Sequence, residues 1–244
     1  LYLVLGYDAP YFQLQRHGAA QPRVEAQRHG QELFPAPSVA RTLKDSAASW
    51  RTWPLVGLYF TSFGGFLALT AWLPMFWGSF YGAPHWVALG LTAGFSLLSS
   101  LIRVPGGSWA DRFGGENVAF VAYALLLAGA VLMTTSASFG LSAAGEALMG
   151  LGMGVANAAV FKLVPQYVPD AVGGTAGWVG GLGALGGFAV PPMLGRIAQT
   201  MGHAGYARGY AVYVVLALVS LALTALLYAT RGGVKHAALG APAH

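Results

Sequence analysis

Six long apolar runs dominate the chain, and polar or glycine-rich segments separate each run from the next. Each run has about 20 residues or more, which lets an α-helix cross the hydrocarbon core of a bilayer. The runs cover residues 54–78, 86–109, 118–137, 141–164, 172–198 and 209–229. The pattern therefore predicts an all-α, polytopic membrane protein with six transmembrane helices.

The first part of the chain is different. Residues 7–51 are polar and hold six of the 13 basic residues, which predicts a solvated loop with short helices near 24–33 and 38–48. Before this loop, the sequence LYLVLG at residues 1–6 is apolar but too short to span a bilayer. We expect it to be the end of a truncated transmembrane helix, and the chain to be the C-terminal part of a longer protein. Residues 52–231 would form a six-helix bundle, followed by a tail at 232–244.

The distribution of lysine and arginine predicts the orientation. The side that carries residues 7–51 also holds Arg112, Arg231 and Lys235, whereas the opposite side holds only two arginines. Basic residues concentrate on the cytoplasmic side of membrane proteins, so the loop and the tail are expected in the cytoplasm, next to the inner (plasma) membrane. Aromatic side chains near the ends of several runs are expected to anchor the helices at the membrane surface. These are Trp53, Trp77, Tyr81, Trp86, Trp109 and Tyr210.

Composition excludes several classes of function. The chain is 56% hydrophobic and 9% charged, and its net charge of +5 is spread over connecting segments without a basic stripe for nucleic acid. It has no cysteine, and its six histidines lack the spacing of metal ligands. The sequence GLGALG at 181–186 matches a dinucleotide pattern, but no acidic residue follows Asp170, so we reject a nucleotide site. No cofactor is expected, and no nucleophile–base pair suggests an enzyme.

Arg103 is the first candidate for function, because a charge inside an apolar run is costly and usually faces a cavity or a partner. It lies nine residues before Arg112, so about 13 Å along a helix, and Pro105 follows at once. The only acidic residue within a predicted run is Glu146, near the opposite membrane surface, which makes an ion pair with Arg103 unexpected. The planar guanidinium suits a flat oxyanion. Snorkelling to the surface is the alternative interpretation.

Two aromatic residues and a glycine-rich helix are weaker candidates. Tyr59 and Phe63 are four residues apart and share a helix face, where they could position a ligand or simply pack. The run at 172–198 contains glycines spaced by four, which favours close helix packing and also exposes main-chain amides. Pro191 and Pro192 are expected to disturb this helix.

Polar residues in and next to the runs give the remaining candidates. Asn157 would form an interhelical hydrogen bond or contact a ligand, and Lys162 would snorkel. Glu146 is expected to be interfacial. Asp111 and Arg112, in the loop GGSWADRFGG, could lock two helices in one state or could be an ordinary solvated cap.

Four motifs together resemble a known family. GGSWADRFGG resembles the loop motif of the major facilitator superfamily. IRVPGGSWADRFGG, YFTSFGGF, NAAVFKLVPQ and GGLGALGGFAVP together resemble its nitrate/nitrite porters over residues 50–195. The chain departs from the family where Gly115 and Glu116 replace a basic pair, and where alanines flank Asn157.

The resemblance implies a fold of twelve membrane helices in two halves, of which this chain would be the second. It implies transport of nitrate and nitrite by alternating access, as an antiporter or a proton symporter. Arg103 resembles the anion-binding arginine of the second half, and Tyr59 and Phe63 resemble the aromatics that contact the substrate. Asn157 would contribute to the same site, and Asp111, Arg112 and Lys162 would act in gating. The signature helix would contribute Gly180, Gly181, Gly183, Gly186 and Gly187.

The leading hypothesis is therefore the C-terminal half of a nitrate and nitrite porter. Its expected partners are the lipid bilayer and an N-terminal six-helix half. No nucleic acid is expected as a partner. A major-facilitator carrier for another small anion is the first alternative. A membrane assembly subunit without transport is the second, and it predicts that Arg103 and Tyr59 tolerate substitution. A membrane enzyme is the least favoured.

Overall fold

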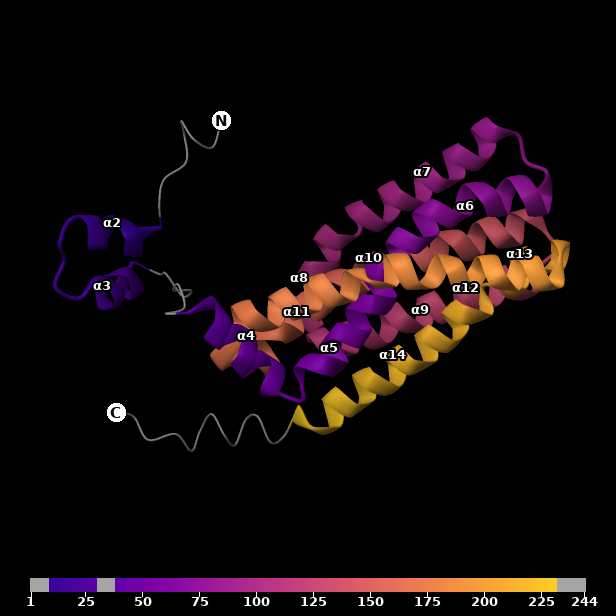
Figure 1. Cartoon of the computed structure of the whole chain (residues 1–244). Coiled ribbons are helices and arrows are strands. Elements are labelled where there is room, and N and C mark those ends of the chain that lie inside the picture. Colours follow the sequence, from indigo (N-terminus) through magenta and orange to yellow (C-terminus); the bar gives the residue numbers. More distant parts are fainter. Residues whose placement is uncertain (1–8, 30–37, 232–244) are drawn as a thin grey trace. The chain divides into compact units, whose positions relative to one another are not determined.

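The computed structural model describes residues 9–29 and 38–231, and within these ranges it contains helices and no strand (Figure 1). The chain divides into two compact units, residues 1–41 and 42–244. The predicted helix at 24–33 is observed as α3 over Pro22–Arg28, and its last residues lie outside the described ranges. A preceding helix, α2 over Pro10–Arg16, was not predicted. The expected end of a helix at 1–6 and the tail at 232–244 also lie outside the described ranges.

Among the described residues, six helical segments are long and apolar enough to cross a membrane, which confirms the prediction of an all-α membrane protein. Their ends differ from the predicted runs by a few residues. The segments are Thr52–Tyr81, His85–Phe113, Gly115–Thr135, Phe139–Tyr167, Pro169–Met201 and His203–Ala229. They contain the helices α5 (Thr52–Tyr59), η1 (Phe60–Gly64), α6 (Gly65–Tyr81), α7 (His85–Leu101), α8 (Arg103–Phe113), α9 (Gly115–Thr135), α10 (Phe139–Tyr167), η2 (Pro169–Ala171), α11 (Val172–Ala184), α12 (Gly186–Met201), α13 (His203–Arg208) and α14 (Ala211–Ala229).

The six segments alternate in direction and form one bundle, with α10 packed against α5, α7, α8 and α9 (Figure 1). The α5 helix begins beside α4 (Val39–Ala48), and we call this end of the bundle the α4 end. The α8, α10 and α14 helices end there, and α9 and α11 begin there. The Trp178 indole donates a hydrogen bond to the Leu43 main-chain oxygen at 3.0 Å, which fixes α4 to α11.

Three of the segments are interrupted in their interior. The first contains a π-helical turn, η1, between α5 and α6. The second is interrupted at Ile102, because Pro105 has no N–H for the main-chain oxygen four residues earlier and its ring crowds that oxygen. The fifth is interrupted at Leu185, among glycines that have low helix propensity. Pro191 and Pro192 were expected to disturb the helix of the fifth segment. This prediction was wrong, because α12 continues through both prolines.

Neighbouring helices support the π-turn through tyrosine hydroxyls. Tyr123 of α9 donates to the main-chain oxygen of Leu58 at 2.7 Å, and Tyr213 of α14 donates to that of Gly65 at 3.0 Å. Both tyrosine side chains are fully buried. A π-turn interrupts the regular hydrogen bonds of an α-helix. Donors from two other helices compensate for this on both sides of the turn.

The first and fifth segments also approach each other closely at the π-turn. A Cβ added to Gly64 would lie 2.5 Å from the main-chain oxygen of Gly183 and 2.6 Å from Cα of Gly186. A Cβ added to Gly186 would lie 2.6 Å from the main-chain oxygen of Phe60. Glycine is required on both sides, because main-chain atoms occupy the space that a side chain would need.

Two of the predicted surface anchors are instead core residues. Trp77 and Tyr210 are completely buried, and both belong to an aromatic cluster around Phe76. The Trp77 indole donates a hydrogen bond to Glu146, which is 4% exposed, so the interfacial position expected for Glu146 is also wrong. The hydrogen bond explains why both residues are buried, because the indole N–H and the carboxylate satisfy each other and need no contact with water.

Glu116 is a second buried acid, and sequence analysis had placed it in a loop. The α9 helix begins at Gly115, and Glu116 is 1% exposed. The Tyr167 hydroxyl lies 2.9 Å from the Glu116 carboxylate and 2.8 Å from the main-chain oxygen of Leu227. Arg231 lies 3.5 Å from the same carboxylate. This cluster joins α9, α10 and α14 at the α4 end.

We predict that Gly64→Ala destabilises the bundle. The added Cβ meets main-chain atoms, so the free energy of unfolding should fall by about 1–3 kcal/mol. The matched control is Gly78→Ala in the same segment, where an added Cβ meets nothing within 4 Å. Thermal unfolding in detergent compares the two variants, and equal melting temperatures would contradict the close approach.

Candidate functional site

Arg103 is the first residue of α8, directly after the interruption at Ile102. The end of α8 at Phe113 is ten residues away, roughly 15 Å at the rise of an α-helix. The charge therefore lies well inside the second segment, as predicted, and the side chain is half-buried. Snorkelling to the membrane surface would require the side chain to extend along the helix, but it instead lies over aromatic rings.

Two aromatic rings from the first segment lie next to the guanidinium. Its central carbon lies 5.6 Å from the ring centre of Phe63 and 5.4 Å from that of Phe66. Tyr59 stacks on Phe63 with ring centres 5.1 Å apart. At these distances the rings attract the cation and hold it in place. The structure thus brings together Arg103, Tyr59 and Phe63, the three residues singled out from the sequence.

The same ring stack contains residues that sequence analysis missed. Phe66 stacks on Phe95 of α7 at 5.6 Å, and Phe161 of α10 makes an edge contact with Tyr59 at 5.0 Å. Phe66 could have been found, because it lies three residues after Phe63 and so on the same helix face. Phe95 and Phe161 come from other segments, and no local pattern links them to Arg103.

The guanidinium still has hydrogen-bonding capacity. Its Nε atom is buried and has no hydrogen-bond partner, and Arg103 forms no ion pair with a carboxylate of the described residues. This N–H group can therefore donate to an acceptor that the described chain does not supply. A buried cation without an anionic partner is costly. The arrangement is suited to an external anion.

The glycines predicted for the site fall into two groups. A Cβ added to Gly183 would lie 2.8 Å from Cδ1 of Tyr59, and a Cβ added to Gly187 would lie 2.9 Å from Cβ of Leu67. Gly186 lies against the π-turn, as described above. Nothing lies within 4 Å of an added Cβ at Gly180 or Gly181. Gly183 therefore makes room for the Tyr59 ring, whereas Gly180 and Gly181 leave open space beside α11.

Asn157 is buried in α10 at 3% exposure, and neither its amide nitrogen nor its amide oxygen has a hydrogen-bond partner. It lies four residues before Phe161, so both belong to the helix face that meets Tyr59. An unpaired buried amide costs free energy. The interhelical hydrogen bond considered from the sequence is not formed with the described residues.

Of the predicted gating residues, two form a pair at the α4 end. Lys162 of α10 forms an ion pair with Asp111 of α8, and both side chains are substantially exposed. Arg112 instead lies over the ring of Phe113, with its guanidinium carbon 5.3 Å from the ring centre. The Asp111–Lys162 pair links the end of the helix that carries Arg103 to α10.

The sequence is similar to a known family and to several known proteins. The model of the Major Facilitator Superfamily matches residues 3–191. The chain is 38% identical to the probable nitrate/nitrite antiporter NarK1 of Thermus thermophilus over 162 residues, which is 59% of the chain and 37% of that protein. It is 34% identical to the nitrite extrusion protein of Bacillus subtilis over 176 residues, or 72% of the chain and 44% of that protein.

A third relative is the probable nitrate/nitrite transporter NarK2 of Mycobacterium tuberculosis, 33% identical over 197 residues. That match covers 78% of the chain and 49% of the relative. The chain thus spans about half the length of the curated relatives that it matches, or less. These relatives are named as transporters rather than enzymes.

We predict that Asn157→Leu raises the melting temperature. Leucine has a similar size and removes two buried polar atoms without partners, a gain of about 1–3 kcal/mol. The control is Thr134→Val, because the Thr134 hydroxyl already donates to the main-chain oxygen of Ala130 at 2.7 Å, so its removal brings no such gain. A lower melting temperature for Asn157→Leu than for the parent protein would show that the amide has a partner.

Proposed function

The chain belongs to the major facilitator superfamily, and on this basis we propose that it is the second half of a carrier for nitrate and nitrite. It is a multi-pass membrane protein with six membrane segments. The missing half would supply the other wall of the substrate site, because the relatives are about twice as long as the matched region. Two halves that rock about a site near the middle of the membrane would carry the anion across.

The guanidinium of Arg103 is the observation that carries this proposal. It lies within a membrane segment, aromatic rings hold it, and its buried Nε has no acceptor. Nitrate and nitrite are small planar anions whose oxygens can accept two parallel hydrogen bonds from the guanidinium edge. Tyr59, Phe63 and Phe66 would line one side of the anion, and the amide of Asn157 would be a further donor.

The remaining predicted residues have roles in conformational change. Open space beside Gly180 and Gly181 would admit the anion or the other half of the carrier, while Gly183, Gly186 and Gly187 would let two segments slide. The Asp111–Lys162 pair would lock α8 to α10 in one state, with Arg112 next to it. The pair is exposed, so its contribution would be small enough to break in each cycle.

The orientation is part of the proposal. The excess of lysine and arginine on the α4 end favours a cytoplasmic position for residues 7–51 and for the tail at 232–244, with the bundle at 52–231 in the inner membrane. Residues 7–51 would then be the linker between the two halves, and residues 1–6 the end of the sixth helix of the first half.

Exchange is the expected mode, because both buried acids of the described chain are occupied by other partners and neither is paired with Arg103. Glu146 is bound to Trp77, and Glu116 to Tyr167 and Arg231. The full-length carrier in proteoliposomes should take up external nitrate when the vesicles contain nitrite, and much less when they are empty. Uptake into empty vesicles driven by a proton gradient would indicate symport instead. If nitrate does not move in either case, the proposed substrate is wrong.

Arg103→Lys should reduce the initial rate of nitrate uptake by about tenfold or more. Lysine keeps the charge but loses the planar pair of donors, and hydrogen bonds to charged groups contribute about 1.5–3 kcal/mol. The matched control is Arg208→Lys, an exposed position at the end of α13. Uptake is compared at equal amounts of folded protein, and a normal rate for Arg103→Lys would show that the planar guanidinium is not needed to bind the anion.

A further inference from the structure

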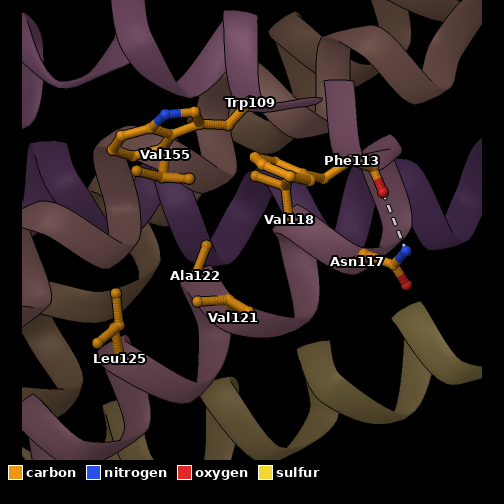
Figure 2. Close-up of a pocket in the computed structure, with 8 residues that line it drawn as sticks. All are labelled: Trp109, Phe113, Asn117, Val118, Val121, Ala122, Leu125 and Val155. Carbon is orange, nitrogen blue, oxygen red and sulfur yellow. Dashed lines mark hydrogen bonds between the residues drawn. The ribbon is translucent and has the colours of Figure 1, made fainter. Parts of the chain in front are cut away.

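An apolar groove lies on a different part of the bundle from Arg103. Its volume is about 290 Å³, and its walls come from the end of α8, the first turns of α9 and Val155 of α10 (Figure 2). Trp109 and Phe113 form one wall, and Val121 and Leu125 continue along α9. None of the ring residues near Arg103 lines this groove, so the transport mechanism leaves it without a role.

The groove runs from the membrane surface into the hydrocarbon region. The α9 segment begins at Gly115, and the lining residues of α9 extend from Asn117 to Leu125. Eight residues of α-helix correspond to roughly 12 Å of depth. Val121 is 62% exposed and Phe113 is 56% exposed, so within the described bundle the groove is open rather than covered by another helix. At this depth, an open apolar surface can accommodate a lipid acyl chain.

A cation lies at the mouth of the groove. The guanidinium of Arg112 is stacked on the ring of Phe113, which is itself a wall of the groove. The neighbouring carboxylate of Asp111 is paired with Lys162, so its negative charge is compensated. The Asn117 side-chain nitrogen donates to the main-chain oxygen of Phe113 at 3.0 Å, which leaves the amide oxygen able to accept (Figure 2).

We propose that this groove binds one anionic phospholipid, with an acyl chain between α8 and α9 and the phosphate at Arg112. The apolar walls match a hydrocarbon chain, and the arginine matches a phosphate, to which it can donate two hydrogen bonds. A soluble ligand of the same size would need several polar groups in the walls, and the side chains of the walls offer only the Asn117 amide at the mouth and the Trp109 indole N–H. The proposed lipid site does not depend on which anion the carrier transports.

Native mass spectrometry of the purified full-length carrier tests the proposal. The delipidated protein is titrated with phosphatidylglycerol and, separately, with phosphatidylcholine that has the same acyl chains. The expected result is one tightly bound phosphatidylglycerol and weaker binding of phosphatidylcholine. Arg112→Gln should reduce the preference for the anionic lipid by about fivefold, the effect of one basic residue at a membrane surface.

Filling the groove provides the second part of the test. Val121→Trp should weaken binding of the lipid by about tenfold or more, because the indole takes the space of several methylene groups. The matched control is Val131→Trp, which changes an exposed valine of α9 outside the groove and should leave binding unchanged. Leu125→Trp is a second groove variant, so that a folding defect in one does not prevent the measurement.

Three results would overturn the proposal. The first is equal binding of the two lipids by the parent protein. The second is equal lipid binding by Val121→Trp and Val131→Trp. The third is a parent protein that forms dimers and loses them in Val121→Trp while lipid binding is unaffected, which would identify the groove as a contact between two copies of the chain.

Discussion

The close approach between the first and fifth segments at Gly64, Gly183 and Gly186 is the constraint on which the site depends. Main-chain atoms meet there without intervening side chains, and the π-turn places Tyr59 and Phe63 on the side that faces Arg103. Buried hydroxyl groups then hold the turn in place, among them Ser220, which donates to the Thr61 hydroxyl at 2.9 Å. A π-turn has less regular hydrogen bonding than an α-helix, so this geometry exists only because the surrounding helices support it.

Several charged side chains of the bundle have a specific partner within it, whereas Arg103 does not. Glu146 and Glu116 are buried, and each has a specific donor from another part of the bundle. Lys162 and Asp111 are paired and exposed. Arg103 differs, because aromatic rings are its neighbours and an N–H donor remains without an acceptor. A membrane interior penalises such a group unless another species completes it.

Much of the fold could be predicted from the sequence, because membrane segments need long apolar runs and these can be read locally. The three residues Arg103, Tyr59 and Phe63 could be selected because a charge in an apolar run and an aromatic pair at helical spacing are also local signals. The burial of Trp77 with Glu146, the inclusion of Glu116 in α9 and the contacts of Phe95 and Phe161 could not, because each depends on a partner far away in the chain. The position of the interruptions at Ile102 and Leu185 likewise reflects how a helix accommodates proline and glycine within a packed bundle.

The distribution of these interruptions among the segments has a mechanical consequence. The first, second and fifth segments are each interrupted in their interior, whereas α9 and α10 run unbroken and α14 is continuous over 19 of the 27 residues of the sixth segment. The cluster of Glu116, Tyr167 and Arg231 ties these three continuous helices together at one end. The bundle thus consists of a stiff frame of three continuous helices and three segments that are interrupted. The interrupted segments carry Arg103, the aromatic pair Tyr59 and Phe63, and the glycines at which the first and fifth segments meet. If these segments bend at their interruptions, the aromatic rings and helices around Arg103 would change position, while the three continuous helices keep their contacts with one another.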